Sequence, residues 1–113
     1  MHEMSLAEGV LDLIEDAARR EGFDKVRTVF LEIGRLSSVE PEAMAFCFDA
    51  VAHGSRAEGA RLEIIIVPGT GLCLDCGRVT ALEAVYDACE HCGAAPVQVT
   101  GGTEMRVREL DVE

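Results

Sequence analysis

Two Cys-x-x-Cys pairs constrain the fold of this chain more than any other feature. The pairs are Cys73/Cys76 and Cys89/Cys92, and twelve residues separate them. Each pair can form a tight knuckle whose thiolates point at one ion, so two facing knuckles predict a zinc ribbon with a tetrahedral four-thiolate site. Two disulfides or a redox pair are the alternatives. Either one explains a single pair and leaves the matching second pair as coincidence.

A four-thiolate site predicts stability or an interaction surface rather than catalysis, because no coordination position is left open for a substrate. Glycine follows each pair directly, at Gly77 and Gly93, and permits the positive φ that such knuckles need. A segment of about 30 residues cannot bury enough apolar surface to fold unaided, so metal binding must supply much of its folding free energy. The sequence therefore predicts that the zinc is structural.

The charge balance indicates which partners the chain has. It carries 21 acidic and 10 basic residues, a net charge of -11. Between Pro68 and Gly101 the acids are Asp75, Glu83, Asp87 and Glu90, and the only base is Arg78. Such a surface repels a phosphate backbone, so we expect proteins or metal cations as partners and no nucleic acid.

The N-terminus and the hydropathy pattern predict a soluble protein. Met1-His2-Glu3-Met4-Ser5 lacks a basic segment followed by an apolar core, and no stretch approaches the length of a membrane span. Reduced thiols held by zinc fit the cytosol, where structural disulfides are rare. We therefore expect a cytoplasmic location and no membrane contact.

The first half of the chain predicts a helix and then a strand. A Ser-x-x-Glu capping box at Ser5 and Glu8 precedes apolar residues at helical spacing, and Gly22 follows as a stop. The run from Lys25 to Ile33 is rich in β-branched and aromatic residues and predicts a strand. The predicted buried positions of the helix are Leu6, Val10, Leu13, Ile14, Ala17 and Ala18, and those of the strand are Val29, Leu31 and Ile33.

The second half predicts another helix and two more strands. The helix starts near Pro41 and stops at Gly54, with Met44, Cys47, Phe48 and Val51 on its apolar stripe. Strands are expected over Arg61 to Val67, broken by Pro68-Gly69-Thr70-Gly71, and over Thr103 to Val112. The fold class is thus α+β, a three-stranded sheet with two helices and an inserted zinc ribbon. The expected domains are residues 1–67 with 102–113, and the insert 68–101.

The first three residues form a second candidate metal site. A histidine at position two can chelate a divalent ion through its imidazole, its backbone nitrogen and the terminal amine of Met1, and the backbone nitrogen of Glu3 completes a plane. Four planar nitrogens select nickel(II) or copper(II) over zinc. The predicted ligands for nickel(II) or copper(II) are therefore Met1, His2 and Glu3, with no catalytic residues.

The motifs together resemble those of the HypA/HybF family of hydrogenase nickel-incorporation proteins, and the resemblance spans essentially the whole chain. Two departures are Met4, where leucine is frequent, and Glu90-His91, where proline is common at the first position. The matching segments are Met1-His2-Glu3-x-Ser5-Leu6-Ala7, Gly34-x-Leu36-Ser37-x-Val39-Glu40-Pro41-Glu42-Ala43, Ala57-Glu58-Gly59-Ala60-x-Leu62-Glu63-Ile64, the two knuckles, and Gly101-x-x-x-Met105-x-Val107.

The resemblance implies a non-enzymatic nickel metallochaperone for [NiFe]-hydrogenase maturation. It implies transferred nickel at the Met-His-Glu terminus, structural zinc at the four cysteines, and a sheet-and-helix nickel domain with an inserted ribbon. The implied partners are the nickel-insertion GTPase HypB, the hydrogenase large-subunit precursor and, in some organisms, urease maturation proteins. An acidic zinc-ribbon adaptor without transferable metal explains the cysteines and charge equally well but leaves Met1-His2-Glu3 unexplained. A zinc hydrolase or redox protein fits poorly, because the zinc site is closed.

Three further residues have competing interpretations. Cys47 lies on an apolar stripe and is expected to be a core residue. His53 is expected to interact with the C-terminal end of the second helix. His91, between two cysteines, is either an exposed turn residue or a group that alters the zinc site.

Overall fold

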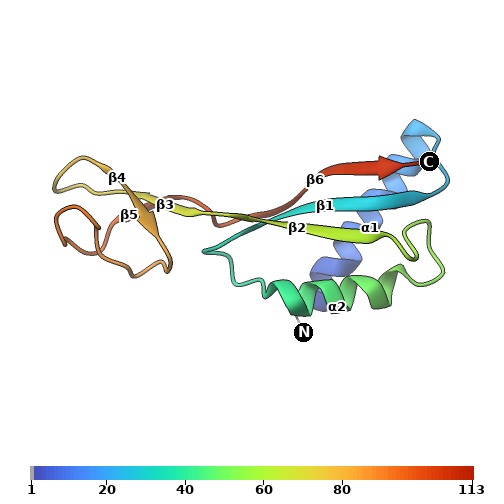
Figure 1. Cartoon of the computed structure of the whole chain (residues 1–113), viewed down its shortest axis with the longest axis horizontal. Helices are drawn as coiled ribbons and strands as arrows, with labels where there is room; N and C mark the ends of the chain where they lie inside the picture. The colour runs from blue at the N-terminus through green and yellow to red at the C-terminus, as the bar shows by residue number, and fades with distance from the viewer. Residues whose placement is uncertain (1) are drawn as a thin grey trace. The chain divides into compact units, whose positions relative to one another are not determined.

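The computed structural model describes residues 2–113 and shows an α+β chain (Figure 1). Two three-stranded sheets have the strand orders β2-β1-β6 and β4-β3-β5. Because β6 pairs with β1, the cysteine-bearing sheet is an insertion between two strands of the first sheet, which confirms the predicted fold class. The elements are α1 (His2–Glu21), β1 (Val26–Gly34), α2 (Pro41–Ala52), β2 (Arg61–Val67), β3 (Gly69–Leu72), β4 (Val79–Leu82), β5 (Gln98–Gly101) and β6 (Met105–Val112).

The chain divides into two compact units. The first comprises the chain up to Leu31, Val39–Ile64 and Val107–Glu113, and the second comprises Glu32–Ser38 and Ile65–Arg106. The first unit contains both helices. The second contains β3, β4, β5 and the four cysteines of the two Cys-x-x-Cys motifs. Across residues 2–113, no helix is long and apolar enough to cross a membrane.

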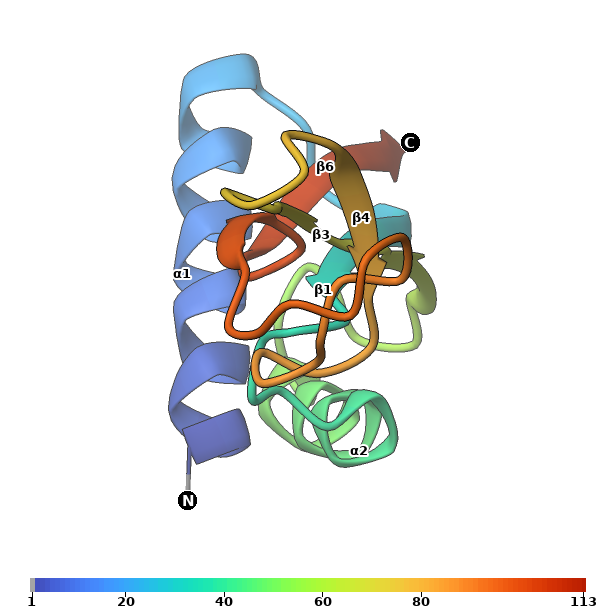
Figure 2. The same cartoon turned by 90° about the vertical axis from the view of Figure 1, so that its left-hand side faces the viewer.

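The core of the first unit lies between its helices and its strands. Helices α1 and α2 pack against each other beside the strands, as Figure 1 and Figure 2 show from two sides. The predicted alternation of β1 is confirmed, since all three apolar positions are buried. Cys47 is fully buried on α2, as expected of a core residue. The core side chains are Ala7, Val10, Ile14, Ala17, Ala18, Val29, Leu31, Met44, Cys47 and Phe48.

The predicted start of α1 was wrong. The helix begins at His2, so Ser5 and Glu8 lie inside it and do not cap it. Ala7 is buried, and Met4 is partly buried, so packing of this turn extends the helix beyond its local start signal. Leu13, predicted to be buried, is 48% exposed because it lies at the edge of the apolar stripe. The first turn of α1 therefore contains His2 and Glu3, two of the three residues expected to bind nickel.

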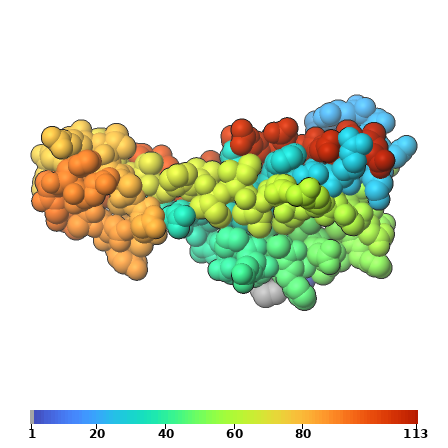
Figure 3. All heavy atoms as spheres, in the orientation of Figure 1, coloured from blue at the N-terminus to red at the C-terminus, as the bar shows by residue number. Residues whose placement is uncertain are grey.

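Helix α2 starts and stops where the sequence predicts. Glu40 is its N-cap, with its Oε1 accepting a hydrogen bond from the Glu42 backbone N–H at 3.1 Å, and Pro41 occupies the first helical position. Gly54 follows the helix with φ +79°. The outer face of α2 reaches the surface (Figure 3), and Phe46 on it is 73% exposed.

The predicted break after β2 was wrong at one point, because Gly69–Leu72 forms strand β3. This strand lies in the centre of the second sheet, between β4 and β5. Local propensity argues against a strand here, since glycine contributes no side chain to pack. A Cβ atom at Gly69 would lie 2.4 Å from the carbonyl oxygen of Leu82, so the close approach of β4 requires glycine.

Glycine is also required at the base of the second unit. Gly34 donates a hydrogen bond to the Glu104 carbonyl oxygen at 2.8 Å, and Leu36 donates one to the Gly102 carbonyl oxygen at 2.7 Å. A Cβ atom at Gly34 would lie 2.2 Å from the Gly102 oxygen. Two backbone segments thus touch directly here, and no side chain fits between them.

We predict that Gly34→Ala destabilises the protein while Gly9→Ala stabilises it. The first substitution forces a methyl group into backbone atoms, which costs about 1–3 kcal/mol. The second replaces an exposed helical glycine that has nothing within 4 Å of an added Cβ atom, and it should gain about 0.5–1 kcal/mol. Thermal unfolding followed by circular dichroism measures both. A Gly34→Ala variant as stable as the parent would contradict the close approach.

Candidate metal centres

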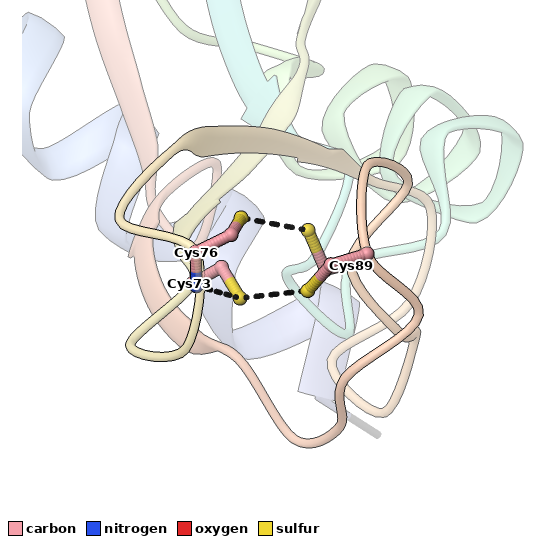
Figure 4. Close-up of side chains that lie close together, drawn as sticks. Cys73, Cys76 and Cys89 are labelled. Carbon is pink, nitrogen blue, oxygen red and sulfur yellow. Dashed lines mark hydrogen bonds between the residues drawn. The ribbon is translucent and has the colours of Figure 1, made fainter.

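The four cysteines converge at the end of the second unit. Cys73 and Cys76 follow β3, and Cys89 and Cys92 lie in the loop between β4 and β5. All four Sγ atoms lie within 4.8 Å of one another. The closest contacts join one knuckle to the other, with Cys73 Sγ 3.5 Å from Cys92 Sγ and Cys76 Sγ 3.8 Å from Cys89 Sγ (Figure 4).

These distances fit a shared ion. A disulfide brings two sulfur atoms to about 2.05 Å, whereas a tetrahedral ion with Zn–S bonds of about 2.3 Å separates its sulfur ligands by about 3.8 Å. The cysteines are free thiols, so the disulfide alternative is wrong. The cluster is consistent with a zinc site of the predicted ligand set.

The two knuckles have the same turn geometry. The Gly77 N–H donates to the Cys73 carbonyl oxygen at 2.8 Å, and the Gly93 N–H donates to the Cys89 carbonyl oxygen at 2.9 Å. Gly77 and Gly93 have φ values of +75° and +77°, as the sequence predicted. A backbone N–H also points at one sulfur of each knuckle, from Cys76 to Cys73 Sγ at 3.5 Å and from His91 to Cys89 Sγ at 3.4 Å.

The surroundings of Cys89 and Cys92 shift the pKa values of these two thiols in opposite directions. Burial raises the pKa of Cys89, but the backbone N–H groups of Cys92 and His91 and the neighbouring thiols lower it more, so the pKa falls to about 6. The Ala94 N–H lowers the pKa of Cys92, yet its contacts with the other thiols, Cys73 first, and burial raise the pKa to about 12. Without a metal the cluster therefore holds protons, and a bound cation must displace them.

Burial divides the cluster into an inner and an outer pair. Cys73 and Cys89 are 1% and 4% exposed, whereas Cys76 and Cys92 are exposed. The inner sulfurs belong to a small core with Leu82 and Val97. Since all four donors suit one tetrahedral ion, the arrangement leaves no open position for a substrate.

His91 lies beside β4 rather than within the thiol cluster. Its ring atom Nε2 is 3.1 Å from the Val79 carbonyl oxygen. His53 is the C-terminal cap residue of α2, and its Nδ1 lies 3.0 Å from Glu58 Oε2. The sequence did not predict either contact, because neither the Val79 carbonyl oxygen nor the Glu58 carboxylate belongs to a motif that would mark it as the partner of a histidine.

The second candidate centre lies at the first turn of α1. Met1 is outside the described residues, so the structure places only His2 and Glu3 of the predicted set. The His2 side chain is 50% exposed, and its Nε2 lies 3.7 Å from Glu3 Oε2. The Glu3 carboxylate is 13% exposed and accepts a hydrogen bond from the Glu40 backbone N–H at 3.1 Å.

Sequence reasoning missed the role of Glu40. The Glu40-Pro41 pair marked a helix start, but nothing in the sequence placed that start beside residue 3. In the structure, the Glu3 carboxylate meets the positive N-terminal end of α2, where anions are favoured. The Glu40 N–H holds the pKa of Glu3 below its ordinary value, because this hydrogen bond favours the ionised carboxylate.

Comparison with known proteins identifies the family. The model of the family described as "Hydrogenase/urease nickel incorporation, metallochaperone, hypA" matches residues 1–112. The chain belongs to the HypA family. Hydrogenase maturation factors HypA from Dechloromonas aromatica and Albidiferax ferrireducens are 63% and 64% identical to it over 113 residues, covering 100% of both chains in each case.

Solved HypA structures share the fold. The solution structure described as the Ni metallochaperone HypA from Helicobacter pylori has a TM-score of 0.70 and 28% identity, covering 97% of this chain and 96% of that one. A second HypA solution structure has a TM-score of 0.68 and 29% identity, with coverage of 100% and 97%. The recognised family and the two-helix, ribbon-bearing fold are thus confirmed, and the family is one of metallochaperones.

We predict that Glu3 controls the pH response of the Glu40 amide. Its pKa is lowered by the Glu40 N–H, so the hydrogen bond to the ionised carboxylate persists at neutral pH. It weakens as pH falls through a value below the ordinary glutamate pKa of about 4.3. Amide NMR spectra between about pH 3 and 6 should show this midpoint at Glu40.

Glu3→Gln is the matched control for this titration. It keeps an acceptor oxygen but cannot ionise, so the corresponding step at the Glu40 amide should disappear. A step of the same midpoint in Glu3→Gln would assign the titration to another group and contradict the contact.

Proposed function

We propose that this chain is a nickel metallochaperone that binds Ni(II) at Met1, His2 and Glu3 and helps to insert it into [NiFe]-hydrogenase. Membership of the HypA family over residues 1–112 is the observation that carries the proposal. His2 and Glu3, at the start of α1, also supply donor atoms suited to nickel.

The position of this site at a helix start suits its chemistry. The first backbone N–H groups of an α-helix have no partner within the helix, so nitrogen atoms of His2 and Glu3 can become metal ligands without breaking helical hydrogen bonds. The terminal amine and the His2 imidazole supply the remaining nitrogens. Half of the His2 side chain faces solvent, which leaves a route for nickel to enter and to leave.

The Glu3 carboxylate supports the site in this proposal. Its hydrogen bond to the Glu40 N–H ties the first turn of α1 to the start of α2. The negative charge of Glu3 also offsets the positive ends of two helices, which would otherwise repel a cation. The carboxylate thus fixes the first turn of α1 and offsets the positive charge that would disfavour binding of a divalent ion.

The four cysteines are assigned to structural zinc. The convergent, closed thiol set favours a tetrahedral d¹⁰ ion that stays in place. We therefore place the delivery site in residues 1–67 with 102–113 and the zinc ribbon in residues 68–101. In this division one metal is cargo and the other maintains the fold.

The proposed partners are the nickel-insertion GTPase HypB and the hydrogenase large-subunit precursor, in the cytoplasm. Urease maturation proteins are a further candidate, because the family description covers urease as well. The net charge of -11 favours cations and basic protein surfaces over nucleic acid. Catalysis has no part in this proposal.

The nickel site predicts a diagnostic spectrum. The parent chain with Ni(II) should show the absorption of a low-spin planar complex, and His2→Ala should abolish it because the imidazole is lost. Acetylation of the terminal amine should abolish it too, because the acetylated nitrogen no longer coordinates the ion. His53→Ala, which removes a histidine elsewhere, is the control. Planar nickel binding that survives both changes would refute the site and favour a zinc-ribbon adaptor without transferable metal.

The zinc site predicts local unfolding. Cys73→Ser or Cys92→Ser should lose zinc and unfold the ribbon, because its core of Cys73, Leu82, Cys89 and Val97 is too small to fold without the metal. Helix α1 should remain folded. Metal analysis, limited proteolysis and amide NMR measure these effects, and Cys47→Ser provides a control outside the cluster. Retained zinc with full protease resistance would contradict the assignment.

A further inference from the structure

The second knuckle is fastened to strand β4 by hydrogen bonds that involve no metal ligand side chain. Glu90 Oε2 accepts a hydrogen bond from the Ala81 backbone N–H at 2.6 Å and one from Thr80 Oγ1 at 3.2 Å. Thr80 Oγ1 in turn accepts a hydrogen bond from the Glu90 backbone N–H at 3.0 Å. We call Glu90 and Thr80, with these bonds, the clasp.

Two features indicate that the clasp is a specific contact rather than a fortuitous pairing of surface side chains. Thr80 is only 1% exposed, so its hydroxyl needs a partner, and Glu90 supplies both an acceptor and a donor. The neighbouring residue adds a parallel bond, because His91 Nε2 lies 3.1 Å from the Val79 carbonyl oxygen. Three consecutive residues of β4 therefore hold two consecutive residues of the knuckle.

The clasp joins the two halves of the metal cluster through the sheet. Strand β4 pairs with β3 in the register Val79↔Leu72 and Thr80↔Gly71. Leu72 directly precedes Cys73. The path from Cys89 through Glu90, β4 and β3 to Cys73 thus consists of protein hydrogen bonds, so it can keep the two thiol pairs facing each other when a metal–sulfur bond breaks.

This arrangement matters in a protein whose proposed cargo is nickel. Four thiolates are strong ligands for Ni(II) as well as Zn(II), and Cys76 and Cys92 are exposed to solvent. Nickel(II) as a d⁸ ion favours a planar ligand set, which requires the two knuckles to rotate relative to each other. Zinc has no such preference and accepts the tetrahedral arrangement.

We propose that Glu90 and Thr80 are positioning residues that hold the Cys89/Cys92 knuckle against the Cys73/Cys76 knuckle, thereby slowing zinc loss and excluding nickel from the ribbon. The inference rests on the proposed zinc assignment. It concerns residues whose side chains are not among the proposed metal ligands.

The rate of zinc loss from the full chain to an excess of a chromophoric chelator tests the proposal. Thr80→Val removes the hydroxyl at constant shape, and Thr80→Ser keeps it. Glu90→Ala removes the carboxylate, and Asp75→Ala removes the same charge from the other knuckle. We expect zinc loss about 10–100-fold faster in Thr80→Val and Glu90→Ala, and rates near that of the parent in Thr80→Ser and Asp75→Ala.

Equal rates in Thr80→Val and Thr80→Ser would overturn the proposal. Equal acceleration by Asp75→Ala and Glu90→Ala would also overturn it, because charge alone would explain the effect. If neither Thr80→Val nor Glu90→Ala takes up one zinc ion per chain, the clasp is needed for folding and not for metal retention, and the proposal fails. A parent chain that binds no zinc would refute the zinc assignment itself, a result distinct from all of these.

Metal selectivity supplies a readout that a loss of stability alone would not change. The variants are combined with His2→Ala, which removes the proposed nickel site, and are offered equimolar Zn(II) and Ni(II). Thiolate-to-nickel charge-transfer absorption should appear with Thr80→Val and Glu90→Ala and should be absent with Thr80→Ser and Asp75→Ala. Nickel exclusion by all four variants would refute the selectivity role.

Discussion

The mutual approach of four cysteine sulfurs is the constraint on which the second unit depends. Among the described residues, the buried apolar cluster around them consists of Cys73, Leu82, Cys89 and Val97, so half of its members are the thiols themselves. Removing a thiol would therefore remove core packing and a metal ligand at once. Such a site cannot release its ion without losing its fold, so in the proposed function a metal that is handed on needs a separate site.

That separate place has the opposite physical character. The first turn of α1 exposes half of the His2 side chain and is tied to α2 by a hydrogen bond from the Glu40 backbone to Glu3. The Glu3 carboxylate and the partly buried Met4 hold this turn, whereas the His2 side chain stays accessible to solvent. In the proposed function, tetrahedral sulfur in a closed core would hold zinc, and planar nitrogen at the exposed start of α1 would hold nickel. Geometry and exchange rate would then separate the two metals.

Much of the fold could be predicted because its signals are local. Alternating Val29, Leu31 and Ile33 predicted β1, Pro41 and Gly54 bounded α2, and the cysteine spacing predicted the ribbon. These signals depend on residues a few positions apart, which a sequence displays directly.

The failures share a cause, since each depends on a neighbour that is remote in the chain. Strand β3 carries glycine because the Leu82 carbonyl lies so close. The contact of Glu3 with Glu40 joins residues 37 positions apart. The hydrogen bond of Glu90 to Thr80 joins residues ten positions apart across the β4–β5 loop, and no local pattern predicts it. Tertiary contacts of this kind override the local secondary-structure propensity, and they produce no periodic pattern in the sequence.

The exposed Gly9 lowers the intrinsic stability of α1. Gly9 has open space where a side chain would lie, and glycine in a helix costs about 1 kcal/mol relative to alanine. Ala7 and Val10 on either side of Gly9 are buried, so tertiary packing rather than helix propensity keeps this part of α1 helical. The first turns of α1 therefore stay helical only while the helix is packed.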